Sequence, residues 1–371
     1  MKKISILCLL SIVLSGCAVT RKIENDNVEL RFLDEYVLPA ETEIDQTAVG
    51  GLSGIDYKNE KLFMVSDDAG NPRIYLADLI IEDKKIREIA VDQLIIIKKT
   101  EEFRNKVFDL EAIRYDKDRT KFIVTSEGAI DDRKDPGIYE ISILGHAKKA
   151  YTIPDYFNSN SAQKPRNNGV FEGITESIDN KGYWVAMELP LEEDGPKPKI
   201  YPSRSHVRIT KYDKETGKPV KQFAYKLDGV SKLPINYFAV NGVTEILEYD
   251  QDKFLILERS YSAGYGSHGN TVKIFDVDAS KATNILDKNE LKGEKYNKAE
   301  KKLIFNFKSV KDQLTREIVD NIEGMCFGPT LENGERSLLL VSDNNFNSFA
   351  EQINQFILMQ IKIKDGDSVT D

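Results

Sequence analysis

Five units repeat along the chain, and each begins with a polar residue, a small residue and an aliphatic residue. A β-rich run follows in each unit and ends in an acidic residue. The five heads are Ser53-Gly54-Ile55, Glu111-Ala112-Ile113, Glu172-Gly173-Ile174, Asn241-Gly242-Val243 and Glu323-Gly324-Met325. The acids that end the runs are Asp67, Glu127, Glu188, Glu258 and Asp343. A repeat of roughly 60 residues with short alternating runs between Gly, Asn and Asp turns is typical of a β-propeller blade.

We therefore predict an all-β fold, a single β-propeller over residues 30–363 with long loops on one face. The two longest spacings between heads have room for a further blade or for insertions, so we favour six blades within a range of five to seven. The N-terminal run Glu29–Leu38 and the C-terminal run Gln355–Ile363 are candidates to close the ring by pairing. Residues 364–371 form a polar tail.

The N-terminal 17 residues have the pattern of an export signal, two lysines followed by an apolar run too short to span a bilayer. The signal ends in Leu14-Ser15-Gly16-Cys17, which resembles a bacterial lipobox; a plain secretory signal with a chance cysteine is the alternative. Residues 18–29 are polar and fit a tether. We expect a protein of the bacterial cell envelope, facing the periplasm or the outside, that touches the membrane only through lipid on Cys17.

The charge and the cysteines exclude two further classes of protein. A formal net charge of −9 argues against nucleic-acid binding, which needs a concentrated basic surface. Of the three cysteines only Cys326 lies beyond the leader, so the mature chain has no intramolecular disulfide. We expect a monomer that acts on a small anionic substrate.

The repeated acids indicate a cation site. The start of one strand and the end of its antiparallel neighbour lie at the same edge of a sheet, so heads and terminal acids are expected to meet around the channel mouth. Carboxylates this close need raised pKa values, arginine partners or bound cations, and Ca²⁺ prefers such oxygens. The predicted calcium ligands are Asp67, Glu111, Glu127, Glu188, Glu258, Glu323 and Asp343. The alternative for each acid is a structural role, capping a turn or binding a backbone amide.

Arginines in the loops that follow the acids indicate an anionic substrate. Arg73, Arg204 and Arg259 are predicted to bind its oxygens, because a guanidinium group binds phosphate or carboxylate through two hydrogen bonds. Each arginine can instead neutralise a neighbouring acid, and Arg259 directly follows Glu258.

Several motifs resemble the family described as "esterase-like activity of phytase", a phytase-like family of bacterial exported proteins. The motifs are Gly51–Ile55, Val65–Asp68, Phe171–Ile174, Leu257–Ser260, Gly269–Val272, Asn321–Met325 and Leu340–Phe346, and the resemblance extends from about Gly50 to Phe356. It implies a phytase-like propeller that hydrolyses esters or phosphate esters. The family often has paired aspartates where this chain has Asp343-Asn344, which removes one charge from the predicted site.

The leading hypothesis is an envelope-anchored, calcium-dependent hydrolase of phosphoric esters, in which Glu172 helps to deprotonate the attacking water. One alternative is a non-catalytic propeller that binds a glycan, a metabolite or a protein partner through the long loops at 158–170 and 189–208. Another is a metal-dependent hydrolase of the lactonase type.

Overall fold

The computed structural model describes residues 27–346 and 352–364 of the chain. The leader, Cys17 and residues 18–26 of the expected tether lie outside the described residues, as does most of the C-terminal tail. Within the described part, no helix has both the length and the apolar character needed to cross a membrane.

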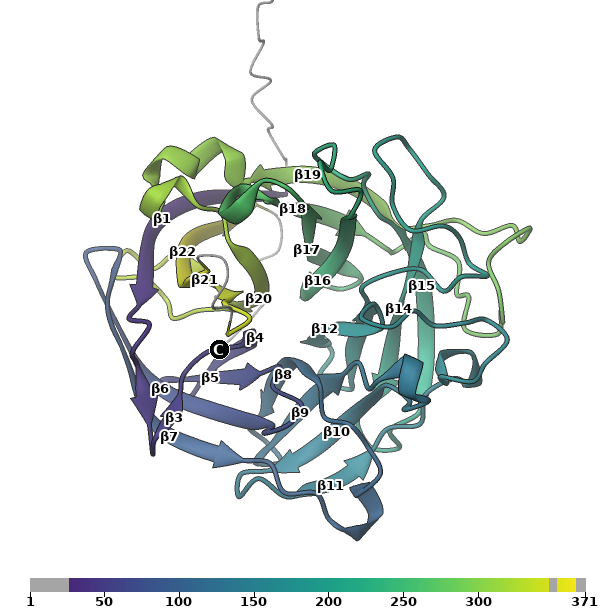
Figure 1. Cartoon of the computed structure of the whole chain (residues 1–371), viewed down its shortest axis with the longest axis horizontal. Helices are drawn as coiled ribbons and strands as arrows, with labels where there is room; N and C mark the ends of the chain where they lie inside the picture. The colour runs from purple at the N-terminus through teal and green to yellow at the C-terminus, as the bar shows by residue number, and fades with distance from the viewer. Residues whose placement is uncertain (1–26, 347–351, 365–371) are drawn as a thin grey trace, which may run out of the picture.

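The described residues form five four-stranded antiparallel sheets arranged as a ring (Figure 1). From the inner to the outer strand, blade 1 consists of β4 (Leu52–Lys58), β5 (Lys61–Ser66), β6 (Arg73–Glu82) and β7 (Lys85–Ile96). Blade 2 consists of β8 (Leu110–Asp116), β9 (Lys121–Ser126), β10 (Gly137–Ser142) and β11 (Ala147–Ala150). Blade 3 consists of β12 (Phe171–Glu176), β13 (Gly182–Met187), β14 (His206–Asp213) and β15 (Pro219–Lys226). Blade 4 consists of β16 (Ala239–Asp250), β17 (Lys253–Ser262), β18 (Asn270–Asp278) and β19 (Glu300–Asn306).

Blade 5 closes the ring with both ends of the chain. It consists of β20 (Asn321–Phe327), β21 (Arg336–Asp343), β22 (Asn354–Ile363) and β1 (Val28–Leu38). The N-terminal strand β1 pairs antiparallel with the C-terminal strand β22, in a register that runs from Val28 opposite Ile363 to Leu38 opposite Asn354. The predicted pairing of the two terminal runs is confirmed.

The all-β propeller is confirmed, and five blades lie within the predicted range, although six were favoured. The long spacings between heads contain insertions. One is the connection from Met187 at the end of β13 to His206 at the start of β14. The other is the connection between β18 and β19, which runs along the outer strand of blade 3 with Ile285 N donating to Gln222 O at 2.9 Å. The remaining short elements are β2 (Glu43–Ile44), β3 (Thr47–Ala48) and 3₁₀ turns at Glu101–Phe103, Ile130–Asp132, Asp155–Phe157, Gly266–His268, Phe307–Gln313 and Thr315–Glu317.

The glycine in the heads of blades 1, 3 and 5 is required because the inner strands approach one another closely around the axis. A Cβ atom on Gly54 would lie 2.6 Å from the Cα of Ala112 in blade 2, and one on Gly324 would lie 3.1 Å from the Cα of Gly54. A Cβ on Gly173 would lie 2.7 Å from the Cα of Glu245 in blade 4. The structural equivalent of the small head residue in blade 4 is therefore Glu245, three positions after the Gly242 that the sequence suggested.

Apolar side chains between neighbouring blades form the core. At the boundary of blades 3 and 4, the ring of Trp184 packs against Phe223 and Phe254, each with a centroid distance of 5.4 Å. Alternation along the strands places such residues between the sheets, and the face of each blade is buried by its neighbour.

Candidate functional site: a carboxylate cavity at the channel mouth

A cavity of about 590 Å³ opens where the inner strands begin. The described residues that line it include eight acidic side chains and two basic ones. The acids are Asp67, Glu111, Glu127, Glu172, Glu188, Asp320, Glu323 and Asp343, and the bases are Lys197 and Arg259. We call this hollow the carboxylate cavity.

Each inner strand contains a β-bulge near its start, and in blades 2, 3 and 5 the acidic head residue at the bulge lines the cavity. In blade 3 the register shifts between Phe171 and Ile174, and the shift encloses Glu172. The other bulges lie at Leu52/Gly54, Leu110/Ile113, Val243/Glu245 and Ile322/Gly324. A bulge inserts a residue into one strand of a pair and changes the direction in which its side chain points.

The terminal acids reach the same place through one repeated backbone contact. In blades 1 to 3 the amide of the acid donates to a carbonyl two residues before the head. The contacts are Asp67 N to Gly51 O (2.9 Å), Glu127 N to Asp109 O (3.1 Å) and Glu188 N to Val170 O (2.8 Å). In blade 5, Asp343 lies opposite Asn321 at the equivalent position. The strand-end acids of four of the five blades thus line the cavity, together with the acidic heads Glu111, Glu172 and Glu323.

Blade 4 differs, because Arg259 takes the position of the acid. Arg259 lines the cavity, whereas the preceding residue Glu258 points to the other face of β17. The Glu258 carboxylate accepts hydrogen bonds from Tyr225 Oη at 2.5 Å and Asn241 Nδ2 at 2.7 Å, and Lys301 Nζ lies 2.6 Å away. The structure therefore does not bring Glu258 into the predicted ligand set, and the Asn241 side chain uses its amide as a donor to Glu258.

Two of the three predicted substrate-binding arginines lie outside the cavity. Arg73 is buried, with Asp68 Oδ2 at 2.8 Å from Nη1 and its Nε donating to Tyr75 Oη at 2.5 Å. Arg204 lines a separate hollow that shares no residue with the carboxylate cavity. Asn344, which replaces the second aspartate of the family motif, accepts a hydrogen bond from Gly51 N at 2.9 Å.

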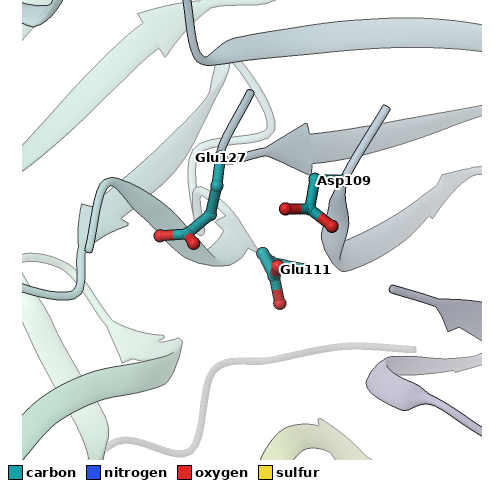
Figure 2. Close-up of side chains that lie close together, drawn as sticks. All are labelled: Asp109, Glu111 and Glu127. Carbon is teal, nitrogen blue, oxygen red and sulfur yellow. The ribbon is translucent and has the colours of Figure 1, made fainter. Parts of the chain in front are cut away.

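Two overlapping groups of acids lie close enough to share a cation. Oxygen atoms of Asp109, Glu111 and Glu127 all lie within 4.8 Å of one another (Figure 2), and so do those of Glu127, Glu172 and Glu188. We call these two groups the first and the second triad; Glu127 belongs to both. Asp109 was missed in the sequence, although it stands two residues before the head Glu111.

Burial and mutual repulsion raise the pKa values of these acids. The pKa is raised to about 8 for Glu127, chiefly by burial and then by Glu188. Burial, followed by the charges of Glu172 and Glu127, holds the pKa of Glu111 well above its usual value. The pKa of Glu172 is likewise raised well above its usual value, by burial and then by Glu127 and Glu188. Ionising the whole group therefore requires compensating positive charge.

The two bases compensate only part of this charge. Arg259 Nη2 lies 3.0 Å from Glu323 Oε1 and 3.7 Å from Glu188 Oε1, and its Nε has no hydrogen-bond partner within the described residues. Asn321 Nδ2 donates to Glu323 Oε1 at 3.0 Å. The cavity therefore contains more carboxylates than basic groups, and most of its carboxylate oxygens have no cationic partner among the lining residues. Such a set of oxygen ligands fits a hard divalent cation such as Ca²⁺.

An apolar rim borders the cavity on the side of blade 4. Leu233, Ile235, Tyr237 and Phe238 precede β16 and have exposed fractions of 66%, 62%, 100% and 57%. Tyr265 in the β17–β18 connection joins this group, and its hydroxyl donates to Leu233 O at 2.8 Å. Phe238 also lines the carboxylate cavity, so the apolar rim continues into it.

Solved structures with weak overall likeness to this chain include a glutaminyl cyclase, the catalytic domain of an arabinofuranosidase and a propeller. Glutaminyl cyclase from Myxococcus xanthus is 8% identical with a TM-score of 0.41, over 91% of this chain and 98% of that one. The catalytic domain of an α-L-arabinofuranosidase from Coprinopsis cinerea is 8% identical with a TM-score of 0.42, over 90% and 98%. The Dos1 propeller is 9% identical with a TM-score of 0.33, over 83% and 67%. Likeness at this level says nothing about activity.

No curated protein matches the chain in sequence. A family model does match, over residues 47–346, which contain all five heads and all five strand-end acids. Its description is "esterase-like activity of phytase". The match covers most of the chain, and the chain therefore belongs to this phytase-like family.

Proposed function

We propose that this protein hydrolyses phosphoric esters in the carboxylate cavity and that it requires calcium. Membership in the family supports a hydrolase of the esterase type. The observation that carries the finer proposal is the pair of carboxylate triads that share Glu127. Calcium bound there would supply positive charge that offsets the acids and attracts the oxygens of the ester.

Glu172 is the proposed acid–base group. Its side chain is 7% exposed and lines the cavity, and no described residue donates a hydrogen bond to its carboxylate. Once positive charge offsets the neighbouring acids, the Glu172 carboxylate is ionised and can accept a proton from a water molecule that attacks phosphorus. The bulge in β12 fixes its direction, since Phe171 and Ile174 on either side are both paired with β13.

Arg259 and Lys197 are the proposed anchors for the anionic group of the substrate. Arg259 lines the cavity with 14% of its side chain exposed, and its guanidinium is a suitable donor to a phosphoryl oxygen there. The two positive charges of these side chains can balance the charge of one phosphoryl group, but not that of a polyanion such as phytate. The apolar rim around Phe238 favours an ester whose remaining part is aromatic or aliphatic.

The test is hydrolysis by the purified protein, with calcium and after chelation, of p-nitrophenyl phosphate, phytate and p-nitrophenyl acetate. Glu172→Gln is compared with Glu176→Gln at the other end of β12, where Glu176 pairs with Lys214 away from the cavity. We expect calcium-dependent release from p-nitrophenyl phosphate that falls roughly 100-fold or more in Glu172→Gln and stays near the wild-type rate in Glu176→Gln.

Other outcomes would correct the proposal in different ways. If p-nitrophenol is released only from p-nitrophenyl acetate, the protein is an esterase, but phosphoric esters are not its substrates. If release is the same with calcium and after chelation, hydrolysis does not require calcium. If nothing is released while calcium raises the melting temperature, the cavity is a binding site and the protein is not the hydrolase we propose.

We also propose that the protein is anchored to the envelope through lipid on Cys17. The lipobox-like sequence Leu14–Cys17 supports this. Expression in a bacterial host with a radiolabelled fatty acid should label the wild-type chain in the membrane fraction. A Cys17→Ser chain that is labelled equally would contradict the anchor.

A further inference from the structure

A second hollow, of about 540 Å³, lies at the outer edge of blade 3 and shares no residue with the carboxylate cavity. Its lining residues come from the start of β14 and from the β18–β19 connection. They are Arg204, His206, Thr283, Glu294, Lys295, Tyr296, Asn297 and Lys298. We call it the basic pocket.

The β18–β19 connection is firmly attached to blade 3, so the basic pocket has a defined shape. Ala299 N donates to Ala224 O at 2.9 Å, and Leu291 N donates to Asp194 Oδ1 at 2.8 Å. Leu291 packs with Ala224 and Ile285 in a small buried cluster that also contacts Tyr296. These contacts hold Tyr296 and the residues beside it against the first residues of β14.

The lining of the basic pocket contains three cationic side chains and one acidic side chain, Glu294. Arg204, Lys295 and Lys298 form no ion pair with any described residue, although the chain as a whole is acidic. Glu294 and Asp194 already have partners, whereas Asp278 and Glu300 line an adjoining hollow that also contains Lys298. Glu294 Oε2 lies 2.6 Å from Lys288 Nζ, and both Asp194 oxygens bind the Arg208 guanidinium, at 2.6 and 2.8 Å.

A buried histidine forms the inner wall of the pocket. His206 is 8% exposed, and its Nδ1 shares a short hydrogen bond with the hydroxyl of Tyr296. Burial, and then the charges of Arg204, Lys226 and Lys298, lower the pKa of His206 to about 4. The imidazole is therefore neutral at physiological pH. The positive charge of the pocket comes from Arg204, Lys295 and Lys298, which remain available to bind an external anion.

We propose that the basic pocket is a second anion-binding site, which takes a phosphate group as free phosphate or as a phosphate monoester. Such a dianion matches several cations at once. Its oxygens accept hydrogen bonds from the Arg204 guanidinium, the two lysines and the Asn297 amide. A monocarboxylate carries too little charge for this arrangement. The inference does not rest on the proposed hydrolase activity, because it uses none of the residues of the carboxylate cavity.

The test is titration of the calcium-free protein with inorganic phosphate, followed by histidine NMR and calorimetry. The chain has only three histidines, His146, His206 and His268. We expect phosphate to shift the ring signals of His206 and to leave the other two unchanged. Parallel titrations with glycerol phosphate and acetate identify the ligand class: glycerol phosphate binds if the site accepts monoesters, and acetate does not compete.

Lys298→Ala and Arg204→Ala should each weaken phosphate binding roughly tenfold or more, because each removes a charge-assisted hydrogen bond. The matched control is Lys218→Ala, at the opposite end of the β14–β15 hairpin, which makes the same change in net charge on an exposed lysine. An equal loss of affinity in Lys218→Ala, a shift at His268 in place of His206, or binding of acetate as tight as that of phosphate would each overturn the proposal. Lys298 is exposed, so its variant is expected to keep the wild-type melting temperature.

Discussion

The guanidinium of Arg114 in blade 2 lies 2.9 Å from the carboxylate of Glu245 in blade 4, and both side chains are buried at the centre of the ring. Together they contact all five inner strands. Arg114 donates to Ile55 O (2.8 Å), Ile113 O (2.7 Å), Met325 O (3.1 Å) and Ile246 O (3.4 Å), and Glu245 Oε1 accepts from Ile174 N (2.8 Å). One ion pair therefore occupies the channel below the carboxylate cavity.

The first prediction concerns this pair. Arg114→Met should lower the free energy of unfolding by about 3–5 kcal/mol, because it leaves the Glu245 carboxylate buried without its partner. Arg87→Met, which removes ion pairs with the exposed Glu82 and Asp83, should cost about 1 kcal/mol or less. Denaturant unfolding of both variants measures the difference; equal, small losses would show that the axial pair contributes little.

The second prediction concerns the number of calcium ions that the proposed site binds. Glu127→Gln should weaken calcium binding at both triads, since Glu127 belongs to each. Asp109→Asn should affect only the first triad, and Glu188→Gln only the second. Isothermal titration of the three variants separates these cases. Loss of a single binding event in Glu127→Gln, with no effect of Asp109→Asn, would indicate one ion at the second triad.

The third prediction concerns pH. The folded chain raises the pKa of Asp109 to about 6, of Asp67 and Glu188 to about 7, and of Glu127 to about 8, in each case mainly through burial. The folded state therefore binds protons that the unfolded state has already released. The metal-free protein should lose stability as the pH rises from about 5 to 8, because the unfolded state binds fewer protons there.

Calcium is the control for this pH dependence, because a bound cation favours the ionised carboxylates. Melting temperatures measured across the same pH range should fall steeply without calcium and much less with it. A metal-free protein whose melting temperature rises with pH would contradict the burial of these acids in a protonated form.

The fourth prediction separates Glu258 from the calcium ligands. Glu258→Gln should lower the free energy of unfolding by about 1–3 kcal/mol, because it weakens the buried contacts with Tyr225 and Lys301. Calcium affinity should stay unchanged, since Glu258 does not line the cavity. Calorimetry and thermal unfolding of the same sample test both statements, and a loss of calcium binding without a loss of stability would restore Glu258 as a ligand.

The fifth prediction concerns the apolar rim. Phe238→Ser should raise KM for p-nitrophenyl phosphate several-fold and leave kcat nearly unchanged, because part of an apolar contact with the aryl group is lost. Leu144→Ser, a similarly exposed apolar residue in the β10–β11 turn, is the control. Equal KM values in the wild type and Phe238→Ser would exclude the rim from substrate binding.

Much of the fold was predictable because the repeat is a local pattern. Alternating runs and turn residues determine strands, and antiparallel pairing then places Glu111, Glu172 and Glu323 beside the strand-end acids of neighbouring strands. The exact number of blades was not predictable in this way, because a long spacing between heads does not distinguish a blade from an insertion. The β18–β19 connection is such an insertion, and its anchor on β15 depends on contacts between distant segments.

The sequence by itself determined the repeated blades, the ring closure and most of the acidic cluster. The tertiary structure decided which face each side chain of blade 4 occupies. Along a strand the period is two, so a difference of one residue moves Glu258 out of the cavity and Arg259 into it. It also decided the place of Arg73, which is the first residue of β6, and that of Arg204, which lies in the long β13–β14 connection. Finally, it decided the pairing of Arg114 with Glu245, which are 131 residues apart and meet at the centre of the ring.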